Sequence, residues 1–366
     1  MILRVCSADE LRGLLPAAIA GRTALMPLAD PGDAAALRPD LPAGERTAVV
    51  VTTSGSTGTP KQVMLSADAM LASARATRER LGGPMHWYSP LPLHYVAGLM
   101  TLVRSHEAGT TTVDVRSDLA DLPPAELDQP RAISIVPTQL HRVMAADADP
   151  WVLERLAGFD AVLLGGAPAP TDLLDRARAA GVRLVTTYGM SETCGGCVYD
   201  GVPLPGADVR LDEATGRIMI GGPMLFSGYR FDPSLTEETL VDGRFLTSDR
   251  GEWGPDGRLR VLGRVDDVVI SGGVNVDLAQ VQRHVDMLGV VGAVVGVPDD
   301  EWGTVVTLAV EGHDEGDLKA SAWRERLAAS GLGRPALPRR VVGMIRLPRT
   351  DSGKIDRRAL SRLLRG

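Results

Sequence analysis

Short apolar runs alternate with longer amphipathic segments through the first half of the chain. The apolar runs predict buried strands at 48–51, 87–93, 110–115, 132–136, 159–164 and 182–187. Helical spacing predicts helices at 67–81, 137–144 and 171–180, with two weaker ones at 8–15 and 33–37. Strands that alternate with helices favour parallel sheets covered on both faces, in which ligands bind at the carboxyl ends of strands. We therefore expect an α/β fold with its binding site at strand ends.

The pattern changes after residue 209, where shorter apolar segments are separated by turns at 212–216, 221–222 and 256–257. This pattern predicts an antiparallel or barrel-like piece. The remaining residues predict a small α+β unit, with helices at 277–288, 318–327 and 357–364 and strands at 290–297, 303–311 and 340–345. We expect a large domain over residues 1–265 and a small domain over residues 266–366.

The loop after the strand at 48–51 has the composition of a polyphosphate-binding site. Residues 52–61 read TTSGSTGTPK. The glycines let the backbone approach an anion, the hydroxyls add donors, and the lysine adds a point charge. The pattern is not a Walker A motif, in which a helix opens directly behind Gly-Lys-Ser/Thr. A flexible linker is the alternative, but a linker needs neither a buried strand before it nor Pro60-Lys61 at its end. The candidate ligands are Thr53, Ser54, Gly55, Ser56, Thr57, Gly58 and Lys61.

Two further strand ends carry turns that can converge on the same ligand. The strand at 159–164 ends in Gly165, Gly166 and Ala167, and the strand at 182–187 ends in the run from Tyr188 to Thr193. These two turns and the loop 52–61 all lie at the carboxyl ends of strands, where ligands of parallel sheets bind. We therefore expect one nucleotide there, with its phosphates on the loop 52–61 and its flat base against the other two turns.

An apolar helix expected at 98–103 ends at Arg104. A helix that is apolar almost all round is buried, so the charge of Arg104 needs a partner. Two interpretations stay open at this point. Arg104 interacts with the dipole at the carboxyl end of its helix, or it binds a carboxylate of a substrate.

Composition and charge narrow the class of protein. The hydrophobic content of 44% and charged content of 23% are typical of globular proteins. The net charge is −7 and both signs are mixed along the chain, unlike the basic stripe of a nucleic-acid-binding protein. No apolar run has the length of a membrane span, and charged residues interrupt the N-terminus too early for a signal peptide. We expect a cytoplasmic protein.

The three cysteines, Cys6, Cys194 and Cys197, do not form a disulfide framework, which favours a reducing compartment. Cys194 and Cys197 have the C-x-x-C spacing of metal sites and redox motifs. A metal site needs a second pair of ligands at similar spacing, and the sequence offers none. The other interpretation is a loop of small residues that makes room for a ligand.

Five motifs stand in the order typical of one superfamily, at 53–61, 188–193, 247–251, 263–273 and 348–354. On these motifs the chain resembles the adenylate-forming superfamily of acyl-CoA synthetases, nonribosomal-peptide adenylation domains and luciferases. Residues 188–204 and the helix at 98–104 resemble the short, actinobacterial type of o-succinylbenzoate–CoA ligase from menaquinone biosynthesis.

The resemblance implies a large N-terminal domain, a mobile C-terminal lid and two half-reactions. ATP, with Mg²⁺, and the aromatic dicarboxylate o-succinylbenzoate would give an acyl-adenylate and pyrophosphate. Coenzyme A would then displace AMP to form a thioester.

The resemblance also implies roles for single residues. Lys354 is the adenylation lysine, Glu192 the Mg²⁺ ligand and Asp249 the ribose ligand, while Arg264 reaches the ribose or a phosphate and Asp266 is the hinge. Gly165, Gly166, Ala167 and Tyr188 enclose adenine, with Gly189, Met190, Ser191 and Thr193 in the same nucleotide-binding turn. Gly98, Arg104, Ser191, Gly195 and Gly196 line the acyl pocket, and Gly272 and Gly273 line the path of coenzyme A.

The chain departs from the superfamily pattern at a few positions. Gln62 stands where glycine is usual after Pro-Lys, and Ser248 replaces a common glycine. Tyr95 holds the place of a gating histidine, with His94 one residue earlier, so the residue that guards the acyl pocket stays open. Two other functions stay open, a different aryl- or acyl-CoA ligase and a carrier-loading adenylation enzyme. A homodimer is a further expectation for the assembly. A non-catalytic relative would lack Lys354 or Glu192, and both are present.

Overall fold

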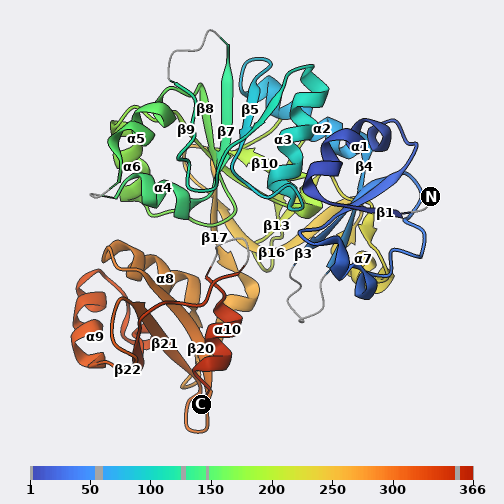
Figure 1. The fold of residues 1–366 in the computed structure, drawn as a ribbon. Helices are drawn as coiled ribbons and strands as arrows, with labels where there is room; N and C mark the ends of the chain where they lie inside the picture. The colour runs from blue at the N-terminus through green and yellow to red at the C-terminus, as the bar shows by residue number, and fades with distance from the viewer. Residues whose placement is uncertain (1–2, 54–60, 125–128, 146–147, 351–354, 366) are drawn as a thin grey trace.

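A computed structural model describes residues 3–53, 61–124, 129–145, 148–350 and 355–365. Its first sheet has the strand order β1-β2-β3-β4-β14 (Figure 1). The strands are β1 (Leu3–Cys6), β2 (Ala24–Pro27), β3 (Thr47–Thr53), β4 (Lys61–Ser66) and β14 (Gly228–Tyr229). The first three are parallel, and β4 and β14 run antiparallel to their neighbours. The strand expected at 48–51 is confirmed within β3.

Side chains along β3 point alternately to the two faces of this sheet, and both faces are buried. Val49 and Val51 belong to a core shared with helices α1 (Ala8–Ile19), α2 (Ala67–Arg80) and α3 (Val96–Ala108). Val50 points into a smaller core on the opposite face, which η1 (Pro31–Leu37) helps to cover. The expected helices at 8–15 and 67–81 are confirmed, and the first of them continues through Pro16 to Ile19.

The second sheet has the order β11-β10-β9-β8-β7-β5-β6. Its strands are β5 (His86–Ser89), β6 (Thr112–Asp114), β7 (Arg131–Ile135), β8 (Ala161–Leu164), β9 (Leu184–Met190), β10 (Gly195–Tyr199) and β11 (Val202–Pro203). The strands from β9 to β6 are parallel, and β10 and β11 form an antiparallel edge. The parallel α/β architecture expected from the sequence is confirmed.

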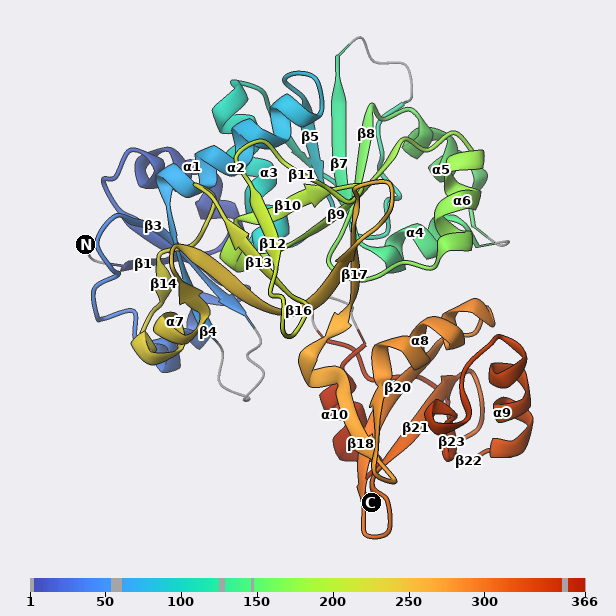
Figure 2. The same ribbon diagram turned by 180° about the vertical axis from the view of Figure 1, so that it is seen from behind.

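Helices cover both faces of the second sheet (Figures 1 and 2). On one face lie α4 (Pro137–Val143), α5 (Pro150–Ala157) and α6 (Thr171–Ala179), whose apolar residues pack on Ile133 and Val162. On the other face α2 packs against Ala132 and Leu163. A strand that is buried on both faces has a continuous apolar sequence, which is why these strands could be predicted from the sequence.

An antiparallel sheet follows, in the order β12-β13-β16-β15 with β17 beside β16. It contains β12 (Asp208–Leu211), β13 (Arg217–Gly221), β15 (Leu240–Val241), β16 (Arg244–Trp253) and β17 (Leu259–Arg264), with α7 (Pro233–Thr239) between β14 and β15. The antiparallel character expected after residue 209 is confirmed. In Figure 2, the long strands β16 and β17 lead from the two large sheets toward the C-terminal elements.

The remaining elements gather in a smaller lobe below the large sheets (Figure 1). They are η3 (Val265–Asp267), β18 (Val268–Ser271), β19 (Val274–Asp277), α8 (Leu278–Met287), β20 (Gly292–Asp299), β21 (Gly303–Glu311), β22 (Gly316–Asp317), α9 (Ala320–Ala329), β23 (Arg340–Met344) and α10 (Arg357–Leu363). The four-stranded sheet β20-β21-β23-β22 has an apolar core on each face. The expected α+β character is confirmed, while the boundary between 265 and 266 stays a prediction.

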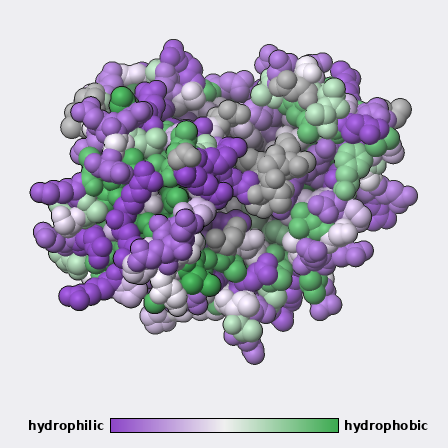
Figure 3. Space-filling view, turned by 90° about the horizontal axis from the view of Figure 1, so that it is seen from below, coloured by the Kyte–Doolittle hydropathy of each residue, from purple (hydrophilic) through white to green (hydrophobic). Residues whose placement is uncertain are grey.

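Hydrophilic side chains are spread over the face seen from below, with smaller hydrophobic areas between them (Figure 3). Within the described ranges, no helix combines the length and the hydrophobicity that crossing a bilayer requires.

Candidate active site

The predicted phosphate loop connects two antiparallel strands. Thr53 at the end of β3 pairs with Lys61 at the start of β4, so both ends of the loop are fixed to the first sheet. The sequence predicted a helix at 67–81 after this region, and the structure adds β4 between the loop and Ser66, which caps α2. Ser54, Gly55, Ser56, Thr57 and Gly58 lie outside the described residues, and their role stays a prediction.

Lys61 and Glu192 approach the same tyrosine. The Lys61 Nζ lies 5.1 Å from the ring centre of Tyr229. The hydroxyl of Tyr229 donates a hydrogen bond of 2.8 Å to Oε1 of Glu192, which lies in η2 (Ser191–Thr193). Sequence reasoning did not find Tyr229, since it lies on a two-residue strand that has no measurable periodicity.

Tyr188, Asp249 and Arg264 come together from β9, β16 and β17. The hydroxyl of Tyr188 donates to Oδ2 of Asp249 at 2.9 Å. Arg264 pairs with Asp249 across the two strands, with its Nη1 3.8 Å from Oδ1. Burial and the charge of Asp249 raise the pKa of Tyr188 far above its usual value, so the phenol keeps its proton and acts as a donor. The three residues assigned to adenine and ribose therefore form one cluster.

The turn after β8 lies beside this cluster, because β8 and β9 are neighbouring strands. A Cβ at Gly165 would lie 2.3 Å from Oγ1 of Thr187, so only glycine fits there. Gly166 has a φ of 83°, and Gly166 and Ala167 are exposed. The turn therefore offers an accessible backbone surface next to Tyr188, as a flat base requires.

The turn from Tyr188 to Thr193 is held by close packing and short hydrogen bonds. A Cβ at Gly189 would lie 2.1 Å from the carbonyl oxygen of Gly195 on β10. The Met190 N–H donates to Oγ1 of Thr193 at 2.9 Å, and this hydroxyl contacts the Gly195 carbonyl at 2.7 Å. Ser191 and Thr193 are buried. The turn thus brings Glu192 to a defined position beside β10.

Arg104 does not end its helix, since α3 continues to Ala108. The interpretation of Arg104 as a helix-terminal arginine is therefore wrong. Its side chain is buried, with Nη2 3.4 Å from the hydroxyl of Tyr199 and the guanidinium 4.7 Å from the ring centre of Trp87. Its Nε is buried and has no hydrogen-bond partner among the described residues. In the part of the chain that the structure describes, no carboxylate pairs with Arg104.

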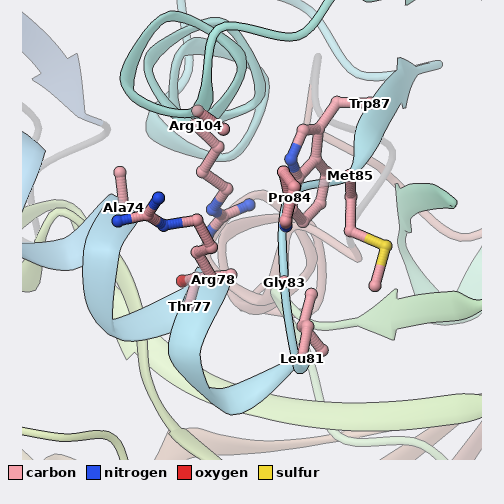
Figure 4. A pocket seen from close by; sticks show the side chains of 10 residues that line it. Ala74, Thr77, Arg78, Leu81, Gly83, Pro84, Met85, Trp87 and Arg104 are labelled. Carbon is pink, nitrogen blue, oxygen red and sulfur yellow. The ribbon is translucent and has the colours of Figure 1, made fainter.

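Arg104 also lies close to the predicted acyl residues on β10. Its Nη2 is 3.9 Å from the position that a Cβ would take at Gly195. On its other side Arg104 lines a small pocket between α2, α3 and β5, where it reaches toward Thr77 and Trp87 (Figure 4). The guanidinium therefore separates the glycine strand β10 from this pocket.

Gly98 is required for the turn that precedes α3, because a Cβ there would lie 2.3 Å from the carbonyl oxygen of Pro92. His94 lies in this turn and Tyr95 is the N-cap of α3, with their ring centres 4.2 Å apart. The two rings are adjacent, so the question of which one guards the acyl pocket stays open. A Cβ at Gly196 would lie 2.9 Å from the ring of Tyr199, which explains the glycine at that position.

Lys354 lies outside the described residues, between Arg349 and Ile355, which form an antiparallel bridge. Asp266 lies in η3, and its side chain is also outside the described part. Gly272 and Gly273 form the turn between β18 and β19 with φ of 58° and 78°. The roles expected for these residues stay predictions.

Cys194 and Cys197 are free and buried. Burial raises the pKa of Cys197 to about 12 and raises the pKa of Cys194 as well. Because redox exchange needs the thiolate, the burial of both thiols argues against a redox role. The Cys194 carbonyl accepts a hydrogen bond from Ser73 at 3.0 Å, which fits a structural loop.

The site fits a magnesium ion that is held mainly by its substrate. Glu192 offers a hard carboxylate oxygen, and no group of three or more metal-ligating side chains occurs among the residues described here. Mg²⁺ commonly binds one or two carboxylates together with substrate phosphates. Glu192 is therefore a suitable ligand for the Mg²⁺ of a nucleoside triphosphate.

The hairpin of β3 and β4, the glycine turn after β8 and Asp249 on β16 belong to three different sheets, and the class of protein that they indicate is a nucleotide-binding α/β enzyme. The chain belongs to the family of AMP-binding enzymes, whose sequence pattern matches residues 13–230. The expected place in the adenylate-forming superfamily is thereby confirmed.

Curated relatives have names of CoA ligases. A probable 2-succinylbenzoate–CoA ligase of Mycobacterium tuberculosis is 44% identical over 331 residues, which cover 87% of this chain and 85% of the relative. A feruloyl-CoA synthase of Amycolatopsis is 32% identical over 377 residues, which cover 92% of this chain and 74% of that enzyme.

Solved structures are similar over nearly the whole chain. The o-succinylbenzoate CoA synthetase (MenE) of Bacillus subtilis with the acyl-adenylate OSB-AMP has a TM-score of 0.76 and 26% identity, covering 98% of this chain and 82% of that one. The same enzyme with ATP and a magnesium ion has a TM-score of 0.71 and 26% identity, covering 92% and 75%. The expected fold class is confirmed.

Proposed function

We propose that the protein is an ATP-dependent o-succinylbenzoate–CoA ligase. The acid and ATP form an acyl-adenylate and pyrophosphate, and the thiol of coenzyme A then displaces AMP to give the thioester. The names of the relatives in Mycobacterium tuberculosis and Bacillus subtilis support this activity. The observation that favours this acid is the buried guanidinium of Arg104 beside Gly195.

The substrate has an aromatic ring and two carboxylates, of which only one is activated. The other carboxylate needs a donor when it leaves water. A guanidinium binds a carboxylate through two parallel hydrogen bonds, and the Nε of Arg104 has no partner within the described residues. A monocarboxylic acid would leave this charge buried and unpaired, which is costly. The site therefore favours a dicarboxylate.

In adenylation, the main obstacle is repulsion between the attacking carboxylate and the phosphates. Asp249 would accept hydrogen bonds from the ribose hydroxyls, while Tyr188 and Arg264 fix its orientation. Lys61 would neutralise the departing pyrophosphate, and Lys354 would bridge the carboxylate and the α-phosphate. Mg²⁺ on Glu192 would supply further positive charge to the phosphates.

In thioester formation, the thiol sulfur would attack the acyl carbonyl carbon and AMP would leave with the electron pair of the broken C–O bond. We assign the nucleotide and acid to residues 1–265 and the lid function to residues 266–366, with Asp266 as the hinge. Gly272 and Gly273 would line the path of coenzyme A. Among the described residues, no atom lies within 4 Å of the position that a Cβ would take at Gly273.

A panel of acids tests this assignment. Purified protein is incubated with ATP, Mg²⁺, coenzyme A and one acid, chosen from o-succinylbenzoate, benzoate, ferulate and octanoate. Pyrophosphate release and the mass of the thioester are measured. We expect kcat/KM for o-succinylbenzoate to exceed the others by about 100-fold or more, since a site built for a polar group strongly rejects acids that lack it. A preference for ferulate would instead support the alternative aryl-CoA ligase.

A further inference from the structure

Tyr229 lies at the junction of two candidate site residues. Its side chain is 4% exposed and sits on β14, which pairs with β4 of the phosphate hairpin. Its hydroxyl donates to Oε1 of Glu192 at 2.8 Å, and its backbone N–H donates to Oγ1 of Thr236 at 2.9 Å. The Phe226 N–H donates to the backbone carbonyl of Glu192, also at 2.8 Å. The segment around Tyr229 therefore holds both the backbone and the carboxylate of Glu192.

The ring of Tyr229 has a second neighbour in Lys61. The Nζ of Lys61 is 5.1 Å from the ring centre, within the range of a cation–π interaction. Tyr229 pairs with Val63, two residues after Lys61 on β4. The ring thus contacts the cation at the end of the phosphate hairpin while its hydroxyl contacts the carboxylate.

The hydrogen bond between these two side chains suits this arrangement. The Tyr229 hydroxyl donates to Oε1 of Glu192. This bond orients the carboxylate and leaves Oε2 available for another ligand.

The next residue anchors this strand from the other side. Arg230 is buried and donates to the carbonyl oxygens of Leu37, Arg38 and Leu41, at 3.1, 2.7 and 2.5 Å. It also donates to Oε1 of Gln62 at 2.8 Å. Successive side chains on a strand point to opposite faces. Arg230 and Gln62 therefore fix the strand pair from the side opposite to Tyr229, which restricts the movement of the tyrosine.

We infer that Tyr229 is a positioning residue that orients Glu192 for Mg²⁺ and keeps Lys61 beside it. The metal ion and the lysine would then act on the same phosphate group. This inference rests on the proposed function, in which Glu192 binds Mg²⁺ and Lys61 binds pyrophosphate. Tyr229 itself need not touch the substrate.

The test replaces only the hydroxyl, in Tyr229→Phe. Binding of Mn²⁺, as a spectroscopic substitute for Mg²⁺, is titrated by electron paramagnetic resonance in the presence of α,β-methylene-ATP, which cannot be cleaved by adenylation. We expect the Kd for Mn²⁺ to rise about 10-fold, the usual scale for losing a residue that orients a metal ligand. The KM for the acid should stay within about twofold of the wild type, because Arg104 is untouched. An unchanged Kd for Mn²⁺ would overturn the inference.

Tyr199→Phe is the matched control, since Tyr199 is equally buried and its hydroxyl contacts Thr77 and Arg104. This variant should leave the Kd for Mn²⁺ unchanged. If it weakened Mn²⁺ binding as much as Tyr229→Phe does, the effect would be a general loss of packing and the inference would be wrong. The acid preference of the wild-type protein tests the proposed function separately, because it does not depend on either tyrosine variant.

Discussion

Arg104 carries a buried charge for which the described protein supplies one hydroxyl and one indole ring. Buried arginines in other places of the fold are better satisfied. Arg131, for example, donates to the carbonyl oxygens of Pro124 and Gly158. Among the described residues, the Nε of Arg104 has no partner and its guanidinium bonds no carbonyl oxygen or carboxylate, so it can take an anionic ligand without losing such bonds.

Replacing Arg104 by methionine should separate acid binding from nucleotide binding. In Arg104→Met we expect KM for o-succinylbenzoate to rise about 30-fold or more, the scale for removing one partner of a buried charge pair. KM for ATP should change little. Steady-state pyrophosphate release measures both constants. Arg78→Met is the control, because Arg78 lines the same small pocket but pairs with Glu107. An unchanged KM for the acid in Arg104→Met would exclude the assignment.

The role of Lys354 is assigned from its motif, and replacing this residue tests the role. In Lys354→Ala, acid-dependent pyrophosphate release should fall about 10²- to 10³-fold, as for a lost contact to developing charge. Thioester formation from a supplied acyl-adenylate should be much less affected, because that step needs no attack on phosphate. Near-normal pyrophosphate release would rule out the proposed role.

Single site residues could be predicted where they belong to a sequence motif. Tyr188, Asp249 and Arg264 were named from the sequence, and they form one cluster. Tyr229 was not, because its partners Glu192 and Lys61 lie far away in the chain and only the sheet brings the three together. The resemblance alone assigned roles to Lys354 and Asp266, and those roles still need experiments.

At the scale of elements, β9 and β10 approach so closely that glycine is required at their contact. In Gly189→Ala the new Cβ would meet the Gly195 carbonyl oxygen at 2.1 Å. We expect a loss of about 3 kcal/mol or more in the free energy of unfolding, since the two strands must move apart. Chemical denaturation measures the loss.

Gly13→Ala provides the matched control for this substitution. Gly13 lies inside α1, and a Cβ there would meet no atom within 4 Å. The variant should be up to about 1 kcal/mol more stable, because alanine favours the helix. If both variants had the same stability, close packing at Gly189 would not be the reason for a glycine at this position.

Elements with a continuous apolar run or clear periodicity were predictable, including the short strands β5, β6 and β8. The sequence indicated α2, α6 and the buried strands of the parallel sheet, where burial on both faces makes the runs apolar. It missed β1, β2, β4 and β14, which are stabilised by neighbours that are distant in the chain. It also ended α3 too early, because it took the polar residues after Val103 as a stop although the helix continues to Ala108.

At the scale of the whole molecule, the large sheets and the smaller lobe meet where β17 passes into η3. Arg250 on β16 pairs with Asp277, which caps α8, and a Cβ at Gly263 would lie 2.4 Å from the Cβ of Ala279. These contacts join α8 to the strand that precedes the predicted hinge. Any rotation of the lobe about Asp266 must break them.

The three cysteines of the whole chain should be unreactive in the folded protein. Burial raises the pKa of Cys6 to about 11 and that of Cys197 to about 12, and Cys194 is raised as well. Thiolate is the reactive form. At pH 8 only about one Cys6 side chain in a thousand is therefore ionised, and reactivity should rise as pH rises toward 11.

A thiol-reactive chromophore checks this prediction. The folded protein should show no rapidly reacting thiol at pH 8, and the protein in denaturant should show all three. One thiol that reacts at once in the folded state would contradict the burial of that cysteine.

Because the three cysteines of the chain are buried, cysteines introduced at the surface can be labelled selectively. A cysteine introduced at the exposed Glu154 on α5 and another at the exposed Glu325 on α9 would be the positions that take dyes at neutral pH. Energy transfer between these two dyes would report the separation of the large sheets and the small lobe during turnover. The chain therefore already provides a cysteine background in which the proposed lid motion can be followed in single molecules.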